Sequence, residues 1–318
     1  MLPSLDRAFR YLQGLVTNDL SALETSQKGC VYACLLNAQG RHLHDMFVHR
    51  VSGDQPAVLL DVDASGLPDL VKLLRRYRLR QRIDIADVSD TYSSWVLPSL
   101  LDVSPSPRAA AQAVDSDVAG SSSRGLSTLY AWQRDPRLAA LGARCIGPWA
   151  QGQAAAQERF ARQRYALGVP EGDAEIPHGQ AMPLEYNLDA LNGVAYDKGC
   201  YIGQELVART HFKGVIRKRL MPVRLAAAEP DATPAPPQPG ARVAVAGARE
   251  GAPAKGALRA LCQDAGLALL RLDAALPAAR DQGPGLRIDE GEGPAWEVHP
   301  TVPDWWPAEW TSAEAGSE

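Results

Sequence analysis

Residues 197–205 gather several chemically active groups in one short stretch: a thiol, an amine, an amide and two carboxylates. Lysine, glutamine and glutamate stay outside a protein core unless they are paired. Gly199 and Gly203 indicate a backbone that turns tightly or approaches another group closely. The thiol belongs to Cys200, and both Lys198 and a helix beginning after Gly203 would make it more acidic. A thiolate here could attack a substrate, bind a metal or be oxidised, so we interpret Cys200 as a functional residue.

The same stretch resembles the signature of a known family. The sequence Lys198-Gly199-Cys200-Tyr201-Ile202-Gly203-Gln204-Glu205 is similar to the K-G-C-[FY]-x-G-Q-E motif of the YgfZ-type folate-binding family, relatives of the glycine-cleavage T-protein, an aminomethyltransferase. The similarity continues through residues 164–171, 183–189, 208–211 and 214–220. This extended form resembles the mitochondrial branch, which acts late in iron-sulfur cluster assembly, more than the bacterial tRNA-modification branch.

The resemblance implies a folate-binding assembly factor of the mitochondrial matrix, with tetrahydrofolate as its ligand and A-type iron-sulfur carrier proteins as its partners. It also places Asp45, in the G-x-x-L-x-D pattern of residues 40–45, at the folate site, and makes Cys200 and Asp45 the candidate active residues. The remaining signature positions are Lys198, Gly199, Tyr201, Gly203, Gln204, Glu205 and Arg209.

Elementary chemistry limits these assignments. A pterin needs a carboxylate to pair with its amino-pyrimidine edge, and a glutamyl tail favours an arginine. The chain offers Asp45, Glu171, Glu185 and Glu205 as acids and Arg209 as a base. One cysteine falls short of the usual four cluster ligands. A [2Fe-2S] or [4Fe-4S] cluster on Cys200 would therefore be shared with a partner that supplies more thiolates.

Two other functions stay open, and the sequence does not decide whether the protein is an enzyme. A one-carbon transferase would use Asp45 to assist attack on a folate-borne methylene group and would need no thiol. A tRNA-modification helper would bind RNA in a salt-dependent way through the arginines of residues 75–82 or 217–219. Arginines late in a helix are also expected from the helix dipole, so we interpret residues 75–82 as a solvated face.

Length and composition set the bounds. A chain of 318 residues suits two or three packed units. With 46% apolar and 22% charged residues it is typical of a globular protein. A net charge of −4 argues against a dominant nucleic-acid surface, and no apolar run has the roughly 18 residues that a membrane helix needs. Five cysteines without a secretory leader predict a reducing compartment, and residues 1–10 show no clear transit peptide.

Hydrophobic periodicity predicts an α+β fold. The resemblance implies that this fold consists of T-protein-like mixed units around a central folate-type cavity. Helices are expected at 7–16, 68–79 and 151–167, and strands at 31–36, 43–50, 57–62, 83–88, 92–97, 129–132 and 138–146. From the residues alone, Asp45 in its strand is interpreted as facing solvent. His42, His44 and His49 are interpreted as surface histidines, because no second ligand cluster accompanies them.

The C-terminal part predicts a small antiparallel β-barrel, with strands at 220–225, 242–245, 257–262 and 267–272. We expect Trp296, Trp305 and Trp306 to pack the terminal segment onto a neighbour. The predicted organisation is an N-terminal α+β unit at 1–150 with a low-complexity insertion at 103–127, a central helix and signature region at 151–217, the barrel at 218–310, and a disordered tail at 311–318.

Overall fold

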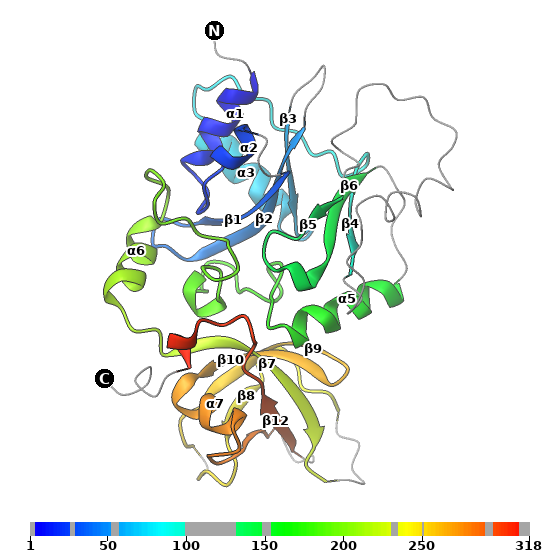
Figure 1. The fold of residues 1–318 in the computed structure, drawn as a ribbon, viewed down its shortest axis with the longest axis vertical. Helices are drawn as coiled ribbons and strands as arrows, with labels where there is room; N and C mark the ends of the chain where they lie inside the picture. Colours follow the sequence, from blue (N-terminus) through cyan, green and yellow to red (C-terminus); the bar gives the residue numbers. More distant parts are fainter. Residues whose placement is uncertain are drawn as a thin grey trace. The chain divides into compact units, whose positions relative to one another are not determined.

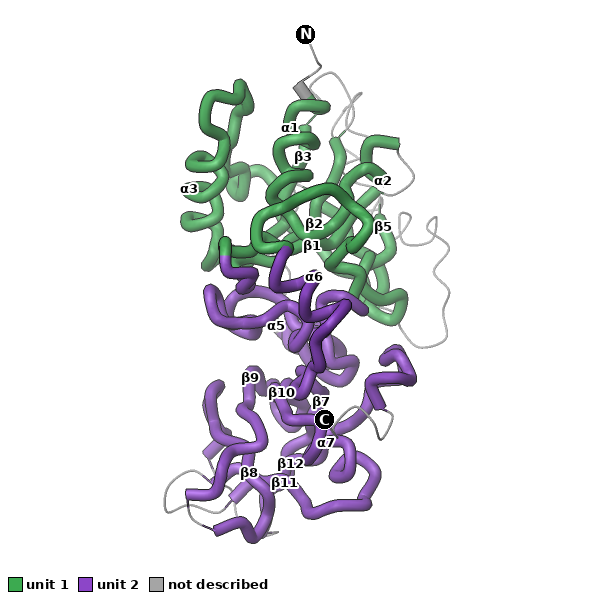
Figure 2. The backbone as a smooth tube through the Cα atoms, turned by 90° about the vertical axis from the view of Figure 1, so that its left-hand side faces the viewer, with its two compact units in different colours: residues 1–38, 43–153, 191–204 green, residues 39–42, 154–190, 205–318 purple. Residues whose placement is uncertain are grey.

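The computed structural model describes residues 4–25, 29–51, 57–98, 132–147, 154–229, 235–249, 251–289 and 295–311 (Figure 1). The chain forms two compact units (Figure 2). The N-terminal unit comprises residues 1–38, 43–153 and 191–204, and the barrel unit comprises residues 39–42, 154–190 and 205–318. The insertion expected at 103–127, the strand expected at 129–132 apart from its last residue, and the tail beyond residue 311 lie outside the described residues. The three-part division remains a prediction.

The first sheet of the N-terminal unit is antiparallel between its second and third strands, and the strand order is β1-β2-β3. The strands are β1 (Cys30–Leu36), β2 (His42–Val51) and β3 (Ala57–Val62), and the helices are α1 (Ser4–Gln13), α2 (Ser21–Glu24) and α3 (Leu67–Arg78). Helices α1 and α3 pack Leu12, Leu70 and Leu74 into one core with strand residues such as Val48. The predicted helices and the hairpin are confirmed, because period-3.6 and period-2 patterns each bury one face.

A second small sheet has the order β4-β6-β5, with β4 (Ser93–Leu97), β5 (Gln133–Arg134) and β6 (Ala143–Gly147), and a 3-10 turn η1 at Ala139–Leu141. The prediction that 83–88 is a strand is wrong, because these residues enter no ladder among the described residues and β4 pairs with β6. The carbonyl oxygens of Ile83 and Ile85 accept hydrogen bonds from the Arg78 and Arg75 side chains instead.

Strand β2 corrects the expected exposure of four polar residues. His42, His44, Asp45 and His49 are all buried, because nine of the ten residues of β2 are covered on both faces of the sheet. A pattern of alternating apolar and polar residues would place the polar ones in solvent, but that holds only for a sheet with one open face. Asp45 is therefore a buried carboxylate, and the three histidines are interior side chains.

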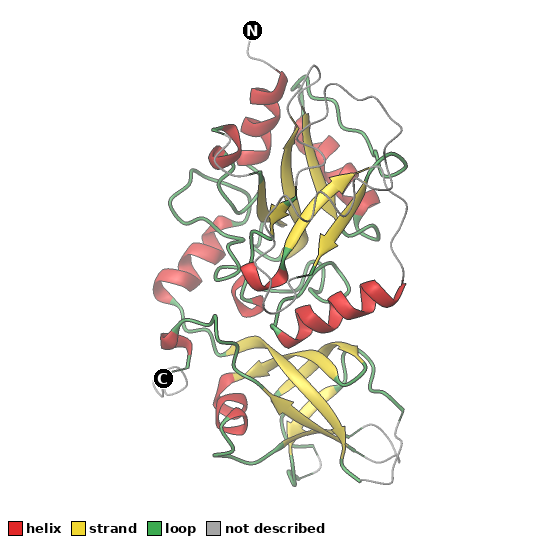
Figure 3. Cartoon of the chain, turned by 45° about the vertical axis from the view of Figure 1, so that its right-hand side comes forward, coloured by secondary structure: helices red, strands yellow, loops and turns green. Residues whose placement is uncertain are grey.

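The barrel unit contains a closed barrel (Figure 3). Neighbouring strands are antiparallel, and their order is β10-β7-β12-β11-β8-β9. The strands are β7 (Lys218–Ala227), β8 (Arg242–Val245), β9 (Gly256–Cys262), β10 (Ala265–Arg271), β11 (Leu286–Ile288) and β12 (Trp296–Pro300). The four expected strands are confirmed; β11 and β12 are short and gave no period-2 signal.

Helices complete the barrel unit: α5 (Ala154–Ala166), α6 (Gln204–Lys213, whose first residue belongs to the N-terminal unit), α7 (Leu272–Ala279) and the 3-10 turns η2 (Pro183–Tyr186) and η3 (Ala308–Trp310). Helix α5 packs on β9 and β10 and is followed by Gly168 at φ +71°, a left-handed conformation that glycine adopts readily and that ends the helix. Trp306 packs into the barrel core with Trp305 and Trp310 beside it, as expected of the terminal segment. Among the described residues, none of the helices is both long and apolar enough to cross a membrane.

Candidate functional site

Cys200 is an exposed thiol held between two anchored neighbours. On one side, Ile202 packs against the core of the N-terminal unit. Tyr201 is half-buried, and its backbone N–H donates to Oε1 of Gln204 at 3.1 Å, the residue at which α6 begins. Gly203 supplies the positive φ of +80° at this turn, as its position in the sequence predicted. The segment therefore presents its sulfur to solvent from a fixed backbone.

Lys198 anchors the other side. Its ammonium donates to the carbonyl oxygens of Gln13, Val16 and Asn18 at 2.8, 2.7 and 2.7 Å, at the end of α1 and in the turn that follows. Burial lowers the pKa of Lys198 to about 8, against the opposing pull of Asp19. The group is still protonated at pH 7, so it carries one proton for each of the three carbonyls. Lys198 thus acts as a clamp: it ties the loop that carries Cys200 to the turn after α1. The sequence did not suggest this role.

The loop before Lys198 is tied to the same turn. The hydroxyl of Thr17 donates to the carbonyl of Gly193 at 2.6 Å and accepts from the backbone N–H of Cys34 at 2.9 Å. The side-chain amide of Asn18 donates to the carbonyls of Tyr32 and Asn192 at 2.7 and 2.6 Å. These bonds join three segments distant in sequence, so the turn after α1 fixes where the signature begins.

Gly199 differs from the expectation of a tight turn or a close approach. Its φ is not positive, and a Cβ built on it would meet no atom within 4 Å among the described residues. The residue directly before the exposed thiol of Cys200 therefore leaves open space beside it.

The five cysteines, all of them described, are free thiols with different environments. Burial raises the pKa of Cys145 to about 12 and raises the pKa of Cys30 and Cys34 further. Burial also raises the pKa of the partly covered Cys262. Cys200 is the only exposed thiol among the five, whereas Cys262 is partly covered and the other three are buried.

Asp45 lies in β2 opposite a tyrosine of β1. The hydroxyl of Tyr32 donates to Oδ2 of Asp45 at 3.0 Å, and both side chains are buried. Burial first, and the Asp45 charge second, raise the pKa of Tyr32 well above its usual value. Tyr32 therefore stays protonated and remains a donor to the carboxylate. The sequence identified Asp45 but not the tyrosine that orients it.

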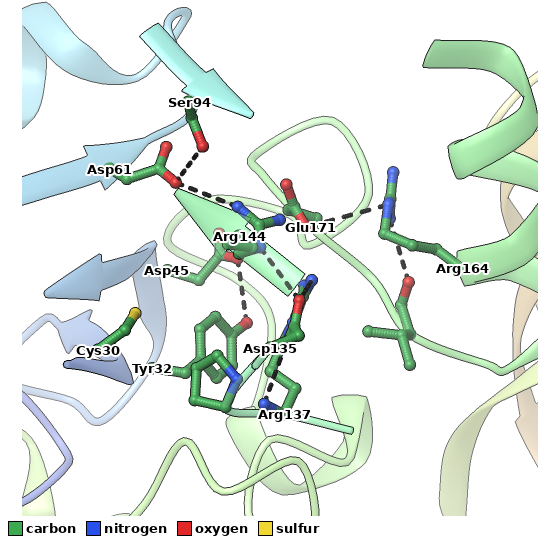
Figure 4. A network of polar contacts seen from close by, with 12 residues as sticks. Cys30, Tyr32, Asp45, Asp61, Ser94, Asp135, Arg137, Arg144, Arg164 and Glu171 are labelled. Atoms are coloured by element: carbon green, nitrogen blue, oxygen red, sulfur yellow. Dashed lines mark hydrogen bonds and ion pairs between the residues drawn. The ribbon is translucent and has the colours of Figure 1, made fainter. Parts of the chain in front are cut away.

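A buried network of charges supports this pair (Figure 4). Asp135 accepts from Nε and Nη2 of Arg137 at 3.0 and 2.8 Å and from Nε of Arg144 at 3.0 Å, with all three side chains at most 2% exposed. Arg144 continues through Nη1 to Asp61 at 3.1 Å. The Arg137 guanidinium also lies 5.4 Å from the centre of the Tyr32 ring, so the network holds the tyrosine that donates to Asp45.

No sequence signal pointed to this network. Its members lie at strand ends and in a loop, and Arg144 and Asp61 are 83 positions apart. A neighbouring buried contact joins Sγ of Cys30 to Nε2 of His49 at 3.6 Å. Burial, with a smaller contribution from Arg144, lowers the pKa of His49 to about 3, so the imidazole is neutral at pH 7.

The remaining predicted site residues belong to the barrel unit. Glu171 lies 4.0 Å from the guanidinium of Arg164, which pairs with Glu175 at 2.7 Å. Burial raises the pKa of Glu185 against the nearby charges of Lys218, Arg41 and Arg259. Glu205 and Arg209 are exposed on α6. The structure brings together the signature residues 198–204 in the N-terminal unit, which also holds Asp45, whereas Glu171, Glu185, Glu205 and Arg209 belong to the other unit.

Comparison with a solved structure and with family models identifies the class of fold. The chain aligns with the crystal structure of glycine cleavage system aminomethyltransferase T from Bartonella henselae with a TM-score of 0.59 and 14% identity, over 93% of this chain and 81% of that chain. Residues 217–308 match the family model of the CAF17 C-terminal beta-barrel domain. The fold is therefore that of a T-protein ending in a CAF17-type barrel, as the sequence predicted.

Sequence relatives then define the family. The chain is 36% identical over 313 residues to the mitochondrial iron-sulfur cluster assembly factor IBA57 of Mus musculus and 36% identical over 311 residues to that of Homo sapiens, covering 93% of this chain and 80% of each relative. The homologue from Dictyostelium discoideum is 32% identical over 248 residues, 68% of this chain and 58% of the relative. The chain belongs to the IBA57 family of iron-sulfur cluster assembly factors.

Proposed function

We propose that this protein acts in iron-sulfur cluster assembly by contributing the Cys200 thiolate to a cluster that it shares with an A-type carrier protein. The observation that carries the proposal is that Cys200 is the single exposed thiol of the chain, fixed between Lys198, which donates to three carbonyls, and the partly buried Ile202. A Cβ built on the preceding Gly199 would meet no described atom within 4 Å, so the backbone beside the exposed thiol is uncovered. The relatives are named as mitochondrial, which agrees with the localisation expected from the signature.

The cluster is cargo rather than a resident group. One thiolate cannot complete the usual four ligands, and the other cysteines are buried or partly covered, so the carrier must supply the remaining thiolates. A ligand exchanged between proteins must be reachable from solution, and Cys200 meets that condition. Its neighbours would orient the sulfur, while the carrier would determine the type of cluster.

We expect Cys200→Ser to abolish a shared cluster. The purified carrier and this protein are reconstituted anaerobically with iron and sulfide, and visible absorbance is followed together with complex formation by size-exclusion chromatography. Cys262→Ser is the matched control, because Cys262 is partly covered and its loss should leave the absorbance and the complex unchanged. A wild-type cluster that survives in Cys200→Ser would overturn the proposal.

A tetrahydrofolate-type ligand is a second part of the proposal, at Asp45. The T-protein fold supports it, and Asp45 supplies the carboxylate that a pterin edge requires, oriented by the Tyr32 hydroxyl. Bound there, the folate would supply a carrier for one-carbon groups; the chain's own part is to fix the position of the carboxylate through the Tyr32 hydroxyl. Glu185 belongs to the other unit, and burial raises its pKa.

We expect Asp45→Asn to weaken tetrahydrofolate binding about tenfold or more in isothermal titration calorimetry, since the amide replaces one acceptor oxygen of the carboxylate by an NH2 donor and removes the charge that faces the amino-pyrimidine edge. Glu205→Gln, an exposed acid of the signature, is the control and should bind as wild type does. Equal affinity in all three proteins would remove Asp45 from the site. Cluster sharing measured on the same variant separates this part of the proposal from the role of Cys200.

A further inference from the structure

The turn that follows α3 displays a large apolar side chain in solvent. Leu79 is 82% exposed, whereas Phe212 and Val215, the next most exposed large apolar residues of the described chain, are 67% and 55% exposed. A leucine normally stabilises a protein by leaving water for the core. Leu79 gains little of this stabilisation, so its exposure needs another reason.

The backbone of Leu79 is also strained. Its φ is +49° and its ψ is −116°, a combination outside the regions allowed to a residue with a Cβ. Positive φ is common directly after a helix, but glycine usually occupies that position because it has no Cβ to clash. Gly168 does so after α5. A leucine here costs stability, and strain of this kind is typically found where the residue has a function.

Cations lie on both sides of this leucine in the sequence. Residues 70–83 contain one lysine and five arginines but no acidic residue. Two of the arginines have structural contacts, because Arg75 and Arg78 donate to the carbonyls of Ile85 and Ile83. The remaining cations are exposed and form no ion pair within the described part of the chain. They are Lys72, Arg76, Arg80 and Arg82.

The helix dipole accounts for only part of this charge. It favours cations in the last turn of a helix, and Arg75, Arg76 and Arg78 lie there. Arg82 lies more than a turn beyond the end of α3 at Arg78, past the reach of the dipole. A solvated helix end therefore explains neither this arginine nor the strained leucine.

We propose that Leu79 together with Arg76, Arg80 and Arg82, here called the basic tip, binds the surface of an anionic lipid bilayer. Charge complementarity selects this partner, because guanidinium groups pair with lipid phosphates while the leucine enters the apolar layer beneath them. The apolar stems of the arginines lie along that layer with their charged ends at the phosphates. The whole chain has a net charge of −4, so the attraction is local to the basic tip.

Two other anionic partners fit the basic tip less well. RNA offers phosphates but no apolar layer for a leucine, and its unpaired bases are held by stacked aromatic side chains. Tyr77, the single aromatic residue of 70–83, is partly buried. An acidic protein would have to supply a pocket shaped for Leu79, whereas a bilayer covers an apolar side chain of any shape.

The test uses the full chain without a cluster and vesicles of phosphatidylcholine, with or without phosphatidylglycerol, in a co-sedimentation assay. We expect binding to the anionic vesicles to exceed binding to the neutral ones about tenfold or more, and to weaken as salt is raised. Leu79→Ser should lower binding to the anionic vesicles about tenfold, because no apolar group then enters the bilayer, whereas Leu79→Phe should keep it. Hydrogen exchange should slow at residues 76–83 only with the anionic vesicles.

Charge variants locate the attraction. Replacing Arg76 and Arg80 by glutamine should lower binding about fivefold for each residue. The matched control replaces Arg159 and Arg224, exposed arginines of the barrel unit, by glutamine and should bind as wild type does. Equal losses in the two double variants would show a response to net charge alone and would overturn the proposal.

Leu79→Gly separates function from stability. Glycine relieves the backbone strain, so this variant should unfold at a higher temperature than wild type and yet bind anionic vesicles about tenfold more weakly. Single-stranded RNA and polyglutamate represent the other anionic partners in the same assay. Binding of either one that depends on Leu79, or vesicle binding that Leu79→Ser leaves unchanged, would sink the assignment of the basic tip to a bilayer.

Discussion

Replacing Asp135 by asparagine should lower the free energy of unfolding by about 3–5 kcal/mol, the range for breaking a buried ion pair from one side. The carboxylate is wholly buried and accepts from Arg137 and Arg144, so the asparagine would leave two buried guanidinium groups without their shared anion. An amide would also turn a donor toward one of them. Equilibrium denaturation in urea, followed by fluorescence and by circular dichroism, measures the change.

An exposed pair provides the matched control. Asp264 accepts from Arg162 at 3.0 Å, but the two side chains are 51% and 45% exposed. Exposed ion pairs contribute about 0–1 kcal/mol, so Asp264→Asn should change stability by no more than that. If Asp135→Asn were as mild as Asp264→Asn, charge would not be what holds the Asp135 network together.

The same network predicts how stability depends on pH. Burial alone would raise the pKa of Asp135, but the charges and hydrogen bonds of Arg137 and Arg144 outweigh it, and the pKa is lowered below 3.8. Between the folded and the unfolded pKa of Asp135, the unfolded chain binds a proton that the folded chain does not. The stability that the Asp135 carboxylate contributes is therefore complete above about pH 4 and is lost as the pH falls through the folded pKa. The stability difference between wild type and Asp135→Asn should therefore narrow below pH 4 and stay constant from pH 5 to 7.

Local hydrophobic patterns predicted most helices and strands, but whether a segment joins a sheet depended on the strand beside it. The hairpin and the helices of the N-terminal unit follow from apolar spacing that a single segment contains. The segment 83–88 has the same kind of spacing, but whether a strand forms depends on a neighbour, and the sequence of the segment does not contain that information. The buried histidines of β2 are a similar case, because their burial depends on what covers the second face of the sheet.

In the candidate site, too, local residue types were predictable from the sequence and distant contacts were not. The residue types around Cys200 pointed to an exposed functional thiol, and the structure places it at the surface. The partners of Lys198 could not be foreseen, since its acceptors lie 180–185 positions earlier in the chain. Asp45 was identified through the family pattern alone, while the charges of Asp135 and Arg137 that support its tyrosine have no local pattern. Side chains that act through distant contacts are thus the part that only the fold reveals.

Replacing Lys198 by methionine should lower the free energy of unfolding by about 3 kcal/mol, because hydrogen bonds to a charged group are each worth about 1.5–3 kcal/mol and water can reach part of this loop. The methionine keeps the length of the side chain but leaves the carbonyls of Gln13, Val16 and Asn18 without their donor. Lys72→Met, on the exposed face of α3, is the control and should stay within about 0.5 kcal/mol of wild type.

The clamp also makes a prediction that a general loss of stability would not. If Lys198 fixes the loop that presents Cys200, hydrogen exchange in Lys198→Met should speed up at the amides of Ala195 and Cys34, which bond to Thr17 in the same turn, while the barrel strands stay protected. Cluster sharing should then fall although the thiol is intact. Uniformly faster exchange through both units would show instead that the lysine supports the fold as a whole, and the link between its three carbonyls and the position of Cys200 would have to be abandoned.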